Sequence, residues 1–203
     1  MSRIAEAVRR GADVVAGLVG LTVTAPVLAA AAVAIRLTMG RGVLFRQRRS
    51  GLGGRPFDVL KLRTMRHPVP GREGPQYDGE RLTSLGRFLR STSIDELPSL
   101  VNLIRGDITL VGPRPLPVGY LTRYTAAERR RLEVKPGITG LAVINGRNDT
   151  TWDERLAWDV RYVEHRSLLG DVRIMVQTVP LVLRRRGISQ PGAVTMRELP
   201  ERR

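Results

Sequence analysis

An uncharged apolar stretch near the N-terminus, VVAGLVGLTVTAPVLAAAAVAI from Val14 to Ile35, is the feature that most constrains this chain. Its 22 residues would form a straight helix of about 33 Å, which is long enough to cross the hydrocarbon core of a bilayer. A cleaved signal peptide is the alternative, but the stretch is longer than the apolar part of such a peptide, and arginines follow it where a cleavage site would be expected. The sequence therefore predicts a membrane-associated segment.

Basic residues lie on both sides of this stretch: Arg3, Arg9 and Arg10 precede it, and Arg36, Arg41, Arg46, Arg48 and Arg49 follow it. Because basic flanks stay on the cytoplasmic side, both ends are expected there. Pro26 removes a helical hydrogen bond and disfavours helical geometry at Ala25, so the chain could bend at this pair and return. We therefore favour a re-entrant helix-break-helix over residues 1–40. A spanning helix that tolerates the proline is the alternative.

Residues 41–203 are expected to form one cytoplasmic α/β domain. Two short strands at 43–48 and 56–62 are predicted around a Gly-rich turn. Helices are predicted at 81–90, 96–105, 153–168 and 171–186, and Arg129 to Arg131 are expected to face solvent. The helix at 171–186 is apolar apart from Arg173 and Gln177, so it suits either the protein core or the membrane interface.

The charge and composition restrict the chemistry. The formal net charge is +15, and every basic residue except Lys61 and Lys135 is arginine, whose planar fork matches phosphate geometry. The partners are therefore expected to be anionic: nucleic acid, lipid headgroups or phosphorylated small molecules. There is no cysteine, which excludes disulfides and thiolate metal sites. Catalysis, if any, must use carboxylates and arginines.

An acidic pair, Asp95 and Glu96, stands out in the segment SIDELPSL. Acids in the first turn of a helix commonly cap free N–H groups, and Ser93 and Glu96 have the spacing of a capping box. Pro98 fits without loss only within the first turn, which argues against a box that begins at Ser93. A plain N-cap at Asp95 stays open as an interpretation.

The same pair also suits catalysis. Arg87, Arg90, Arg105 and Arg114 all lie within about twenty residues of it, a spacing at which the chain can bring them together. An ionised aspartate can attack phosphorus without a base, provided that cations offset the repulsion between the two negative groups. Arginines and a magnesium ion held by one or two carboxylates would do so. Spacing alone leaves capping and catalysis both open.

Four segments taken together, FRQRRSGLGGRPFDVLKLRTM, LRSTSIDELPSLVNLIRGDITLVGPRP, KPGITG and NGRN, resemble the monotopic polyprenyl-phosphate phosphoglycosyl transferases, the bacterial sugar transferase family. The resemblance runs from about Phe45 to Thr178. It implies a small monotopic enzyme at the cytoplasmic face of the bacterial inner membrane, with interfacial helices. Such an enzyme passes a sugar 1-phosphate from a UDP-sugar to a polyprenyl phosphate such as undecaprenyl phosphate, releases UMP, and initiates glycoconjugate or exopolysaccharide assembly.

The resemblance also implies residue roles. Asp95 would be the nucleophile of a ping-pong reaction with a covalent phosphosugar intermediate, and Glu96, next to Asp95, would hold Mg²⁺. The residues expected to bind phosphates or the nucleotide, or to shape their loop, are Arg90, Pro113, Arg114, Pro115 and Arg147. Asp159 also aligns with a family acid and is grouped with these substrate-binding residues, with its role open.

The chain departs from the family pattern at two places. Ala25 stands where a serine commonly precedes the proline at the membrane break, so no hydroxyl can assist the turn. Leu141 and Val143 stand where the family tends to have Trp and Gln after KPGITG. We expect the second departure to alter the recognition of the sugar or the nucleotide.

Two rival functions use the same positive charge: a nucleic-acid-binding module and a non-catalytic, membrane-associated scaffold. Nucleic-acid binding does not explain the apolar stretch, and an aromatic content of 4% is too low for a surface on which bases stack. No nucleic-acid partner is therefore expected. The expected partners are a UDP-sugar, a polyprenyl phosphate and an anionic phospholipid membrane. The sequence leaves open the sugar, the pathway and whether the chain forms a homodimer.

Overall fold

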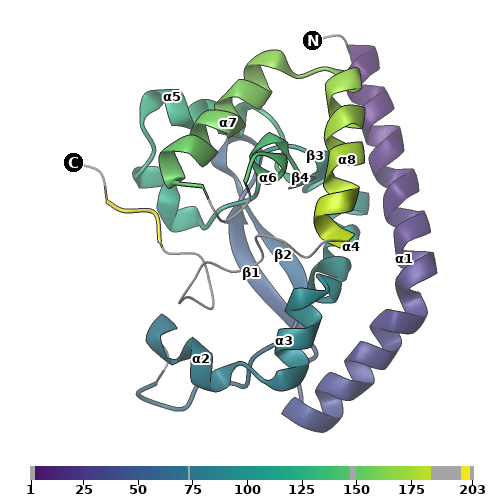
Figure 1. Cartoon of the computed structure of the whole chain (residues 1–203), viewed down its shortest axis with the longest axis vertical. Coiled ribbons are helices and arrows are strands. Elements are labelled where there is room, and N and C mark those ends of the chain that lie inside the picture. The colour runs from purple at the N-terminus through teal and green to yellow at the C-terminus, as the bar shows by residue number, and fades with distance from the viewer. Residues whose placement is uncertain (1–2, 73, 147–149, 184–197, 202–203) are drawn as a thin grey trace.

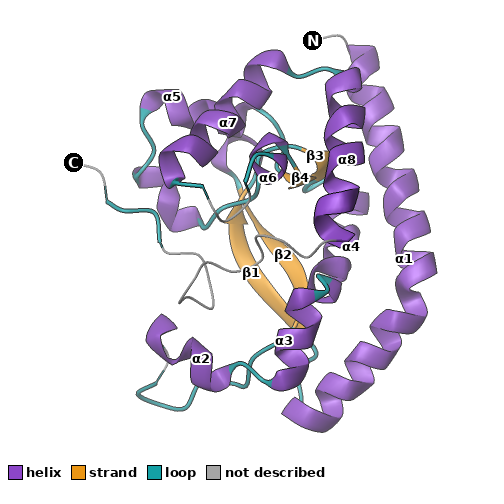
Figure 2. Cartoon of the chain, viewed as in Figure 1, coloured by secondary structure: helices purple, strands orange, loops and turns teal. Residues whose placement is uncertain are grey.

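The computed structural model describes residues 3–72, 74–146, 150–183 and 198–201. Within these ranges the chain is a mixed α/β protein with a long N-terminal apolar helix and two small sheets (Figures 1 and 2). The expected α/β class is therefore confirmed. The division at residue 40 stays a prediction.

The apolar stretch forms a single helix, α1 (Arg3–Met39), which continues through Pro26. Figure 1 shows that α1 bends midway and curves around the rest of the molecule. A proline removes one hydrogen bond from a helix, and a bend can absorb that loss without ending the helix. The expected re-entrant hairpin with a break at Ala25 and Pro26 is therefore not confirmed.

The outer face of α1 is apolar and exposed. Only 11% of its most apolar 18-residue window is buried, so α1 is not the core helix of a soluble protein. It is long and apolar enough to cross a membrane, which together with its exposure indicates membrane association. The exposed large apolar residues in its central part are Val15, Leu18, Val19, Val23, Val27 and Val33.

The inner face of α1 packs closely on α4 (Leu100–Arg105). A Cβ atom at Gly17 would lie 2.6 Å from Cγ1 of Ile104, and one at Gly20 would lie 3.0 Å from Cδ1 of Leu100. Because a real side chain could not fit at Gly17 without displacing its neighbour, the two helices approach each other through glycine.

Polar contacts join the N-terminal part of α1 to the rest of the protein. Nε of Arg9 donates to Oδ2 of Asp171 at 2.6 Å, and Nη1 of Arg10 donates to the carbonyl of Leu103 at 2.7 Å. Asp13 accepts a hydrogen bond from the backbone N–H of Leu110 at 2.8 Å. Arg9 and Arg10, which we expected as flanks of a membrane segment, therefore anchor α1 to the domain.

The predicted hairpin is confirmed. Strand β1 (Leu44–Ser50) pairs antiparallel with β2 (Pro56–Leu62), and a short 3₁₀-helix (Leu52–Gly54) connects them. Gly53 and Gly54 have φ of 63° and 77°, in the left-handed region that glycine adopts at little cost.

A second, parallel pair of strands positions the loop that follows it. Strand β3 (Thr109–Val111) runs beside β4 (Gly137–Thr139). A Cβ atom at Gly112 would lie 2.5 Å from the carbonyl oxygen of Lys135, and one at Gly137 would lie 2.1 Å from the nitrogen of Gly112. Only glycine permits this approach, so the glycines of VGPRP and KPGITG are structural requirements.

The helices predicted at 81–90, 153–168 and 171–186 are present with shifted ends, as α3 (Ser84–Ser91), α7 (Trp152–His165) and α8 (Leu168–Leu183). The chain also forms three short helices, α2 (Asp78–Arg81), α5 (Ala126–Arg129) and α6 (Leu141–Ile144), of which α2 and α6 were not predicted. A 3₁₀-helix (Ile94–Ser99) occupies the predicted start of α4. Arg131 is buried, so the expectation that it faces solvent is wrong: its charge is satisfied inside the protein, as described below.

Candidate active site

Asp95 and Glu96 lie in the first turn of the 3₁₀-helix (Ile94–Ser99), which packs against β2, α1, α3 and α4. Ser93 precedes this helix in the left-handed conformation, with φ of 57°, and its side chain makes no capping hydrogen bond. The capping box is therefore absent. Asp95 lies inside the helix and not at its N-cap, so capping does not explain why the acids are there.

Glu96 is paired with two cations from distant parts of the chain. Nζ of Lys61, on β2, lies 2.8 Å from Oε1 of Glu96, and Nη2 of Arg114, in the loop after β3, lies 2.7 Å from the same oxygen. The charge of Arg114, followed by that of Lys61, holds the pKa of Glu96 well below its usual range although burial acts in the opposite direction. Glu96 is therefore ionised at every physiological pH.

Asp95 lies in a different environment. Its side chain is only 8% exposed, and burial together with the nearby Glu96 carboxylate raises the pKa of Asp95 to about 6. The charges of Lys61 and Arg90 oppose this increase. At neutral pH Asp95 is mostly ionised but poorly solvated, which is the condition of a reactive carboxylate.

Two further arginines lie near the acids. On α3, Nε of Arg90 donates to Oγ1 of Thr64 at 3.0 Å, and the charge of Asp95 counteracts the lowering of the Arg90 pKa by burial. Arg49, at the end of β1, shares a small pocket of about 50 Å³ with Glu96 and Arg114. Burial and the charge of Arg114 lower the pKa of Arg49 to about 10, so it remains a cation.

Lys61 and Arg49 belong to the site although the sequence did not predict them there. In the sequence, Lys61 is distinctive only as one of two lysines, and Arg49 only as a basic residue after the apolar stretch. Their signal in the sequence is weak: both occur in hairpin strands, where the alternation of side chains would have placed them on a definite face. Neither the alternation of side chains nor the spacing of residues shows that this face of the hairpin lies against Glu96.

The two predicted prolines shape the loop that carries Arg114. The carbonyl of Pro113 accepts a hydrogen bond from the N–H of Gly137 at 2.9 Å, and Pro115 lines the pocket beside Glu96. This loop is therefore held to β4 on one side and open to the pocket on the other.

Asp159, on α7, does not line that pocket, because its side chain is almost completely buried. It pairs with Arg131, and Nη2 of Arg131 also donates to the backbone carbonyl of Arg114 at 2.7 Å. Asp159 therefore belongs to the site through Arg131, as a support for the Arg114 loop. Arg147 lies outside the described residues.

The donor atoms near Asp95 suit a small oxygen-binding cation. Among the described residues there is no cluster of three or more His, Cys, Asp or Glu side chains. Lys61 and Arg114 both contact Oε1 of Glu96, and Oε2 has no hydrogen-bond partner among those same residues. One or two carboxylates are the protein ligands that magnesium typically uses together with water and phosphate oxygens.

Comparisons with known proteins show which sequences this chain resembles. The model of the bacterial sugar transferase family matches residues 4–185. The chain is 44% identical over 183 residues to the uncharacterized sugar transferase EpsL of Bacillus subtilis, covering 90% of this chain and 91% of the relative. It is 43% identical to the UDP-glucose:undecaprenyl-phosphate glucose-1-phosphate transferase of Caulobacter vibrioides, covering 86% and 69%. It is 36% identical to the exopolysaccharide production protein ExoY of Rhizobium meliloti, covering 88% and 87%.

Proposed function

The chain belongs to the bacterial sugar transferase family and is a phosphoglycosyl transferase, and from this premise we propose that it passes a sugar 1-phosphate from a UDP-sugar to undecaprenyl phosphate. The name of the C. vibrioides relative supports both substrates, and the name of ExoY supports a role in exopolysaccharide production. Family membership favours this enzyme over the nucleic-acid-binding module and the non-catalytic scaffold.

One observation carries the proposed mechanism: a buried aspartate with a raised pKa, Asp95, lies beside a glutamate that two cations keep ionised. In the first step a carboxylate oxygen of Asp95 attacks the phosphorus that bears the sugar. The bond from that phosphorus to the bridging oxygen breaks, and UMP leaves with the oxygen. The sugar phosphate is then joined to Asp95 as an acyl phosphate.

In the second step an oxygen of undecaprenyl phosphate attacks the same phosphorus. The bond to Asp95 breaks, the carboxylate is regenerated, and the product is undecaprenyl diphosphate-sugar. Because UMP departs before the acceptor reacts, the two half-reactions follow ping-pong kinetics.

The cations near Asp95 make an attack between two negative groups feasible. Arg114 and Lys61 are already neutralised in part by Glu96, and Arg90 and Arg49 add positive charge around the same site. Prearranged cations of this kind stabilise the charge on phosphoryl oxygens in the transition state. We therefore assign phosphate binding to Arg49, Arg90 and Arg114, and by family pattern to Arg147.

Glu96 and Asp95 would hold a magnesium ion, with Oε2 of Glu96 as the available protein oxygen. When bound, the ion would neutralise charge on the diphosphate of the donor and on the departing UMP. Glu96 has two further roles that need no metal: it orients Lys61 and Arg114, and its charge raises the pKa of Asp95.

The position of the enzyme follows from the acceptor. Undecaprenyl phosphate lies in the bilayer, whereas the nucleotide sugar comes from water, so the reaction requires a membrane surface. We place the enzyme at the cytoplasmic face of the inner membrane, with the exposed apolar face of α1 in the lipid and the rest of the protein on the cytoplasmic side. We also propose that α1 enters and leaves the membrane on the same side and does not span it.

Incubation of the purified enzyme with UDP-glucose labelled in the β-phosphate, without an acceptor, tests the mechanism. Wild type should release UMP in a burst and retain the label on the protein, and Asp95→Asn should do neither. Asp58→Asn, which alters an exposed acid on β2, is the matched control and should behave as wild type. Wild-type turnover by Asp95→Asn would exclude the covalent mechanism, and a panel of UDP-sugars would identify the donor.

A further inference from the structure

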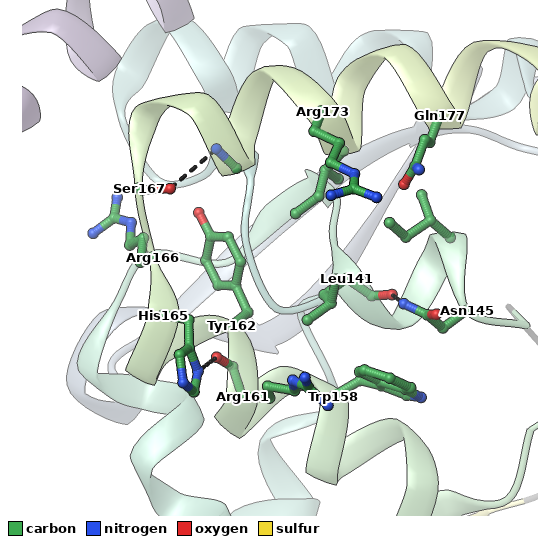
Figure 3. Close-up of a pocket in the computed structure, with 13 residues that line it drawn as sticks. Leu141, Asn145, Trp158, Arg161, Tyr162, His165, Arg166, Ser167, Arg173 and Gln177 are labelled. Atoms are coloured by element: carbon green, nitrogen blue, oxygen red, sulfur yellow. Dashed lines mark hydrogen bonds between the residues drawn. The ribbon is translucent and has the colours of Figure 1, made fainter.

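A larger pocket lies between α7 and α8, with α6 forming one wall (Figure 3). Its volume is about 350 Å³, and it shares no lining residue with the pocket beside Glu96. Its walls combine apolar side chains such as Leu141 and Ile174 with arginines from both long helices. Apart from Leu141, whose position is expected to influence recognition of the sugar or the nucleotide, none of these residues has a role in the reaction proposed above, so the pocket requires its own explanation.

Two arginines from facing helices line this pocket. Figure 3 shows Arg173 and Gln177 extending from α8 toward α7, where Arg161 and Trp158 lie. Arg161 lies over the Trp158 ring, 5.3 Å from its centroid. Neither arginine forms an ion pair with any carboxylate in the described part of the chain. Two unpaired guanidinium groups beside one pocket provide the charge and the hydrogen-bond donors to bind a phosphate.

The outer face of α8 beside this pocket is apolar. Leu169, Val172, Val176 and Val179 are all exposed, and their spacing places them on one stripe of the helix. Arg173 and Gln177 each follow a residue of this stripe, and consecutive helix residues differ by about 100° in direction. The pocket therefore opens along the edge of an apolar stripe.

The same stripe is close to the membrane helix. The buried ion pair between Arg9 and Asp171, 2.6 Å long, fixes α8 beside α1, whose outer face is also apolar and exposed (Figure 1). Arginines at the edge of an apolar surface typically place their charged groups at the level of the lipid headgroups. Here those groups meet a cavity large enough for a headgroup.

We propose that this pocket binds the phosphate of an anionic membrane phospholipid between Arg161 and Arg173, with its acyl chains lying along the apolar stripe of α8. Inorganic phosphate lacks the apolar part, and undecaprenyl phosphate already has a place beside Asp95 as the acceptor in the proposed reaction. This lipid site therefore takes part in no step of the transfer reaction.

Thermal unfolding of the full-length protein in a non-ionic detergent tests this site. The protein is titrated with dioctanoyl phosphatidylglycerol, dioctanoyl phosphatidylcholine, undecaprenyl phosphate or inorganic phosphate. A ligand that binds only the folded state raises the Tm as its concentration increases. We expect a saturable rise with phosphatidylglycerol and none with phosphatidylcholine. Undecaprenyl phosphate should also raise the Tm, because it binds beside Asp95 as the acceptor, and that rise should not depend on Arg161 and Arg173.

Two variants locate the effect. The double variant Arg161→Ala/Arg173→Ala should lose the rise in Tm, and Gln177→Trp, which adds bulk at the pocket without changing the charge, should reduce that rise. Arg55→Ala/Arg129→Ala removes the same charge from two exposed arginines outside the pocket and should retain it. Each shift is measured against the Tm of the same variant without lipid, so lower intrinsic stability does not imitate loss of the site.

Three results would overturn the proposal. In the first, Arg161→Ala/Arg173→Ala keeps the full rise in Tm. In the second, Arg161→Ala/Arg173→Ala and Arg55→Ala/Arg129→Ala lose the rise in Tm equally, which would show that the lipid is attracted to positive charge in general. In the third, inorganic phosphate stabilises the protein as strongly as phosphatidylglycerol at the same concentration, which would make the pocket a site for free anions.

Discussion

Arg131 donates two hydrogen bonds to Oδ2 of Asp159, from Nε at 3.0 Å and from Nη2 at 2.8 Å, and both side chains are only 2% exposed. The same Nη2 donates to the backbone carbonyl of Arg114. A buried ion pair adds little net stability compared with apolar packing, so its main effect here is geometric. It fixes the backbone of the residue whose guanidinium pairs with Glu96.

Asp159→Asn should impair both stability and catalysis. The substitution leaves Arg131 buried without its counter-charge, which typically costs about 3–5 kcal/mol. Because the Arg114 loop then loses its support, we expect kcat to fall roughly tenfold at a temperature where the variant is folded, the size of effect that about 1.4 kcal/mol of misplacement produces. Thermal melting and UMP release measure the two effects.

Glu164→Gln is the matched control for Asp159→Asn. It removes an acid on the same helix, α7, whose partner Arg130 is exposed. An exposed pair contributes about 0–1 kcal/mol, so the control should lose little stability and no activity. Arg131→Lys retains the positive charge but lacks the planar guanidinium that bonds both Asp159 and the carbonyl of Arg114. It should therefore keep more stability than Asp159→Asn while still lowering kcat. Wild-type kcat in both Asp159→Asn and Arg131→Lys would show that the pair does not position Arg114.

The rate of UMP release should fall as the pH is lowered through about 6, which gives the pH profile an acidic limb. The pKa of Asp95 is raised to about 6, so below this pH the carboxyl group becomes protonated and can no longer attack phosphorus. Glu96 remains ionised throughout this range because its pKa is lowered. The measurement is kcat/KM for the UDP-sugar between pH 5 and 8.

Glu96→Gln should move that acidic limb to lower pH. The substitution removes a neighbouring negative charge that raises the pKa of Asp95, while Lys61 and Arg90, which lower it, remain. The overall rate will fall as well, so the position of the limb is the informative quantity. A limb that stays in place or moves to higher pH would contradict the assignment of this limb to Asp95.

Asp95→Asn should stabilise the inactive protein at neutral pH. In the folded state the pKa of Asp95 is about 6, above the ordinary aspartate value of 3.8, so folding favours the protonated form. Stability is therefore lost as the pH rises from about 4 through 6, by at most about 3 kcal/mol. We expect Asp95→Asn to have a higher Tm than wild type at pH 8 and a similar Tm at pH 4. A difference in Tm between Asp95→Asn and wild type that does not depend on pH would refute this account.

Gly17→Ala should weaken the attachment of α1 to α4. Its Cβ atom would lie 2.6 Å from Cγ1 of Ile104, so the helices must separate or Ile104 must move. Such overpacking typically costs about 1–3 kcal/mol. Gly11→Ala is the control on the same helix, because no atom lies within 4 Å of its Cβ position. It should raise stability slightly, since alanine favours helices. Equal Tm values for the two variants would show that the close approach contributes nothing.

The chemistry and the local structure of this protein follow from its sequence. The acidic pair, the prolines beside Arg114, the hairpin and the apolar helix depend on residues that are close together in the chain, and the motifs around them identify the family. Periodicity and turn residues report such features because backbone geometry is decided within a few residues. The three-dimensional partners of charged side chains have no comparable local signal.

Those partners were decided only by tertiary packing. Lys61 and Arg114 meet on one oxygen of Glu96 although they are 35 and 18 residues away from it, and Asp95 and Glu96 acquire opposite pKa shifts because only Glu96 gains this pair. Arg131 looked like a surface residue, but Asp159 holds it in the interior. A buried charged residue needs a counter-charge or hydrogen bonds to offset its lost hydration, and whether it meets them depends on how distant segments pack.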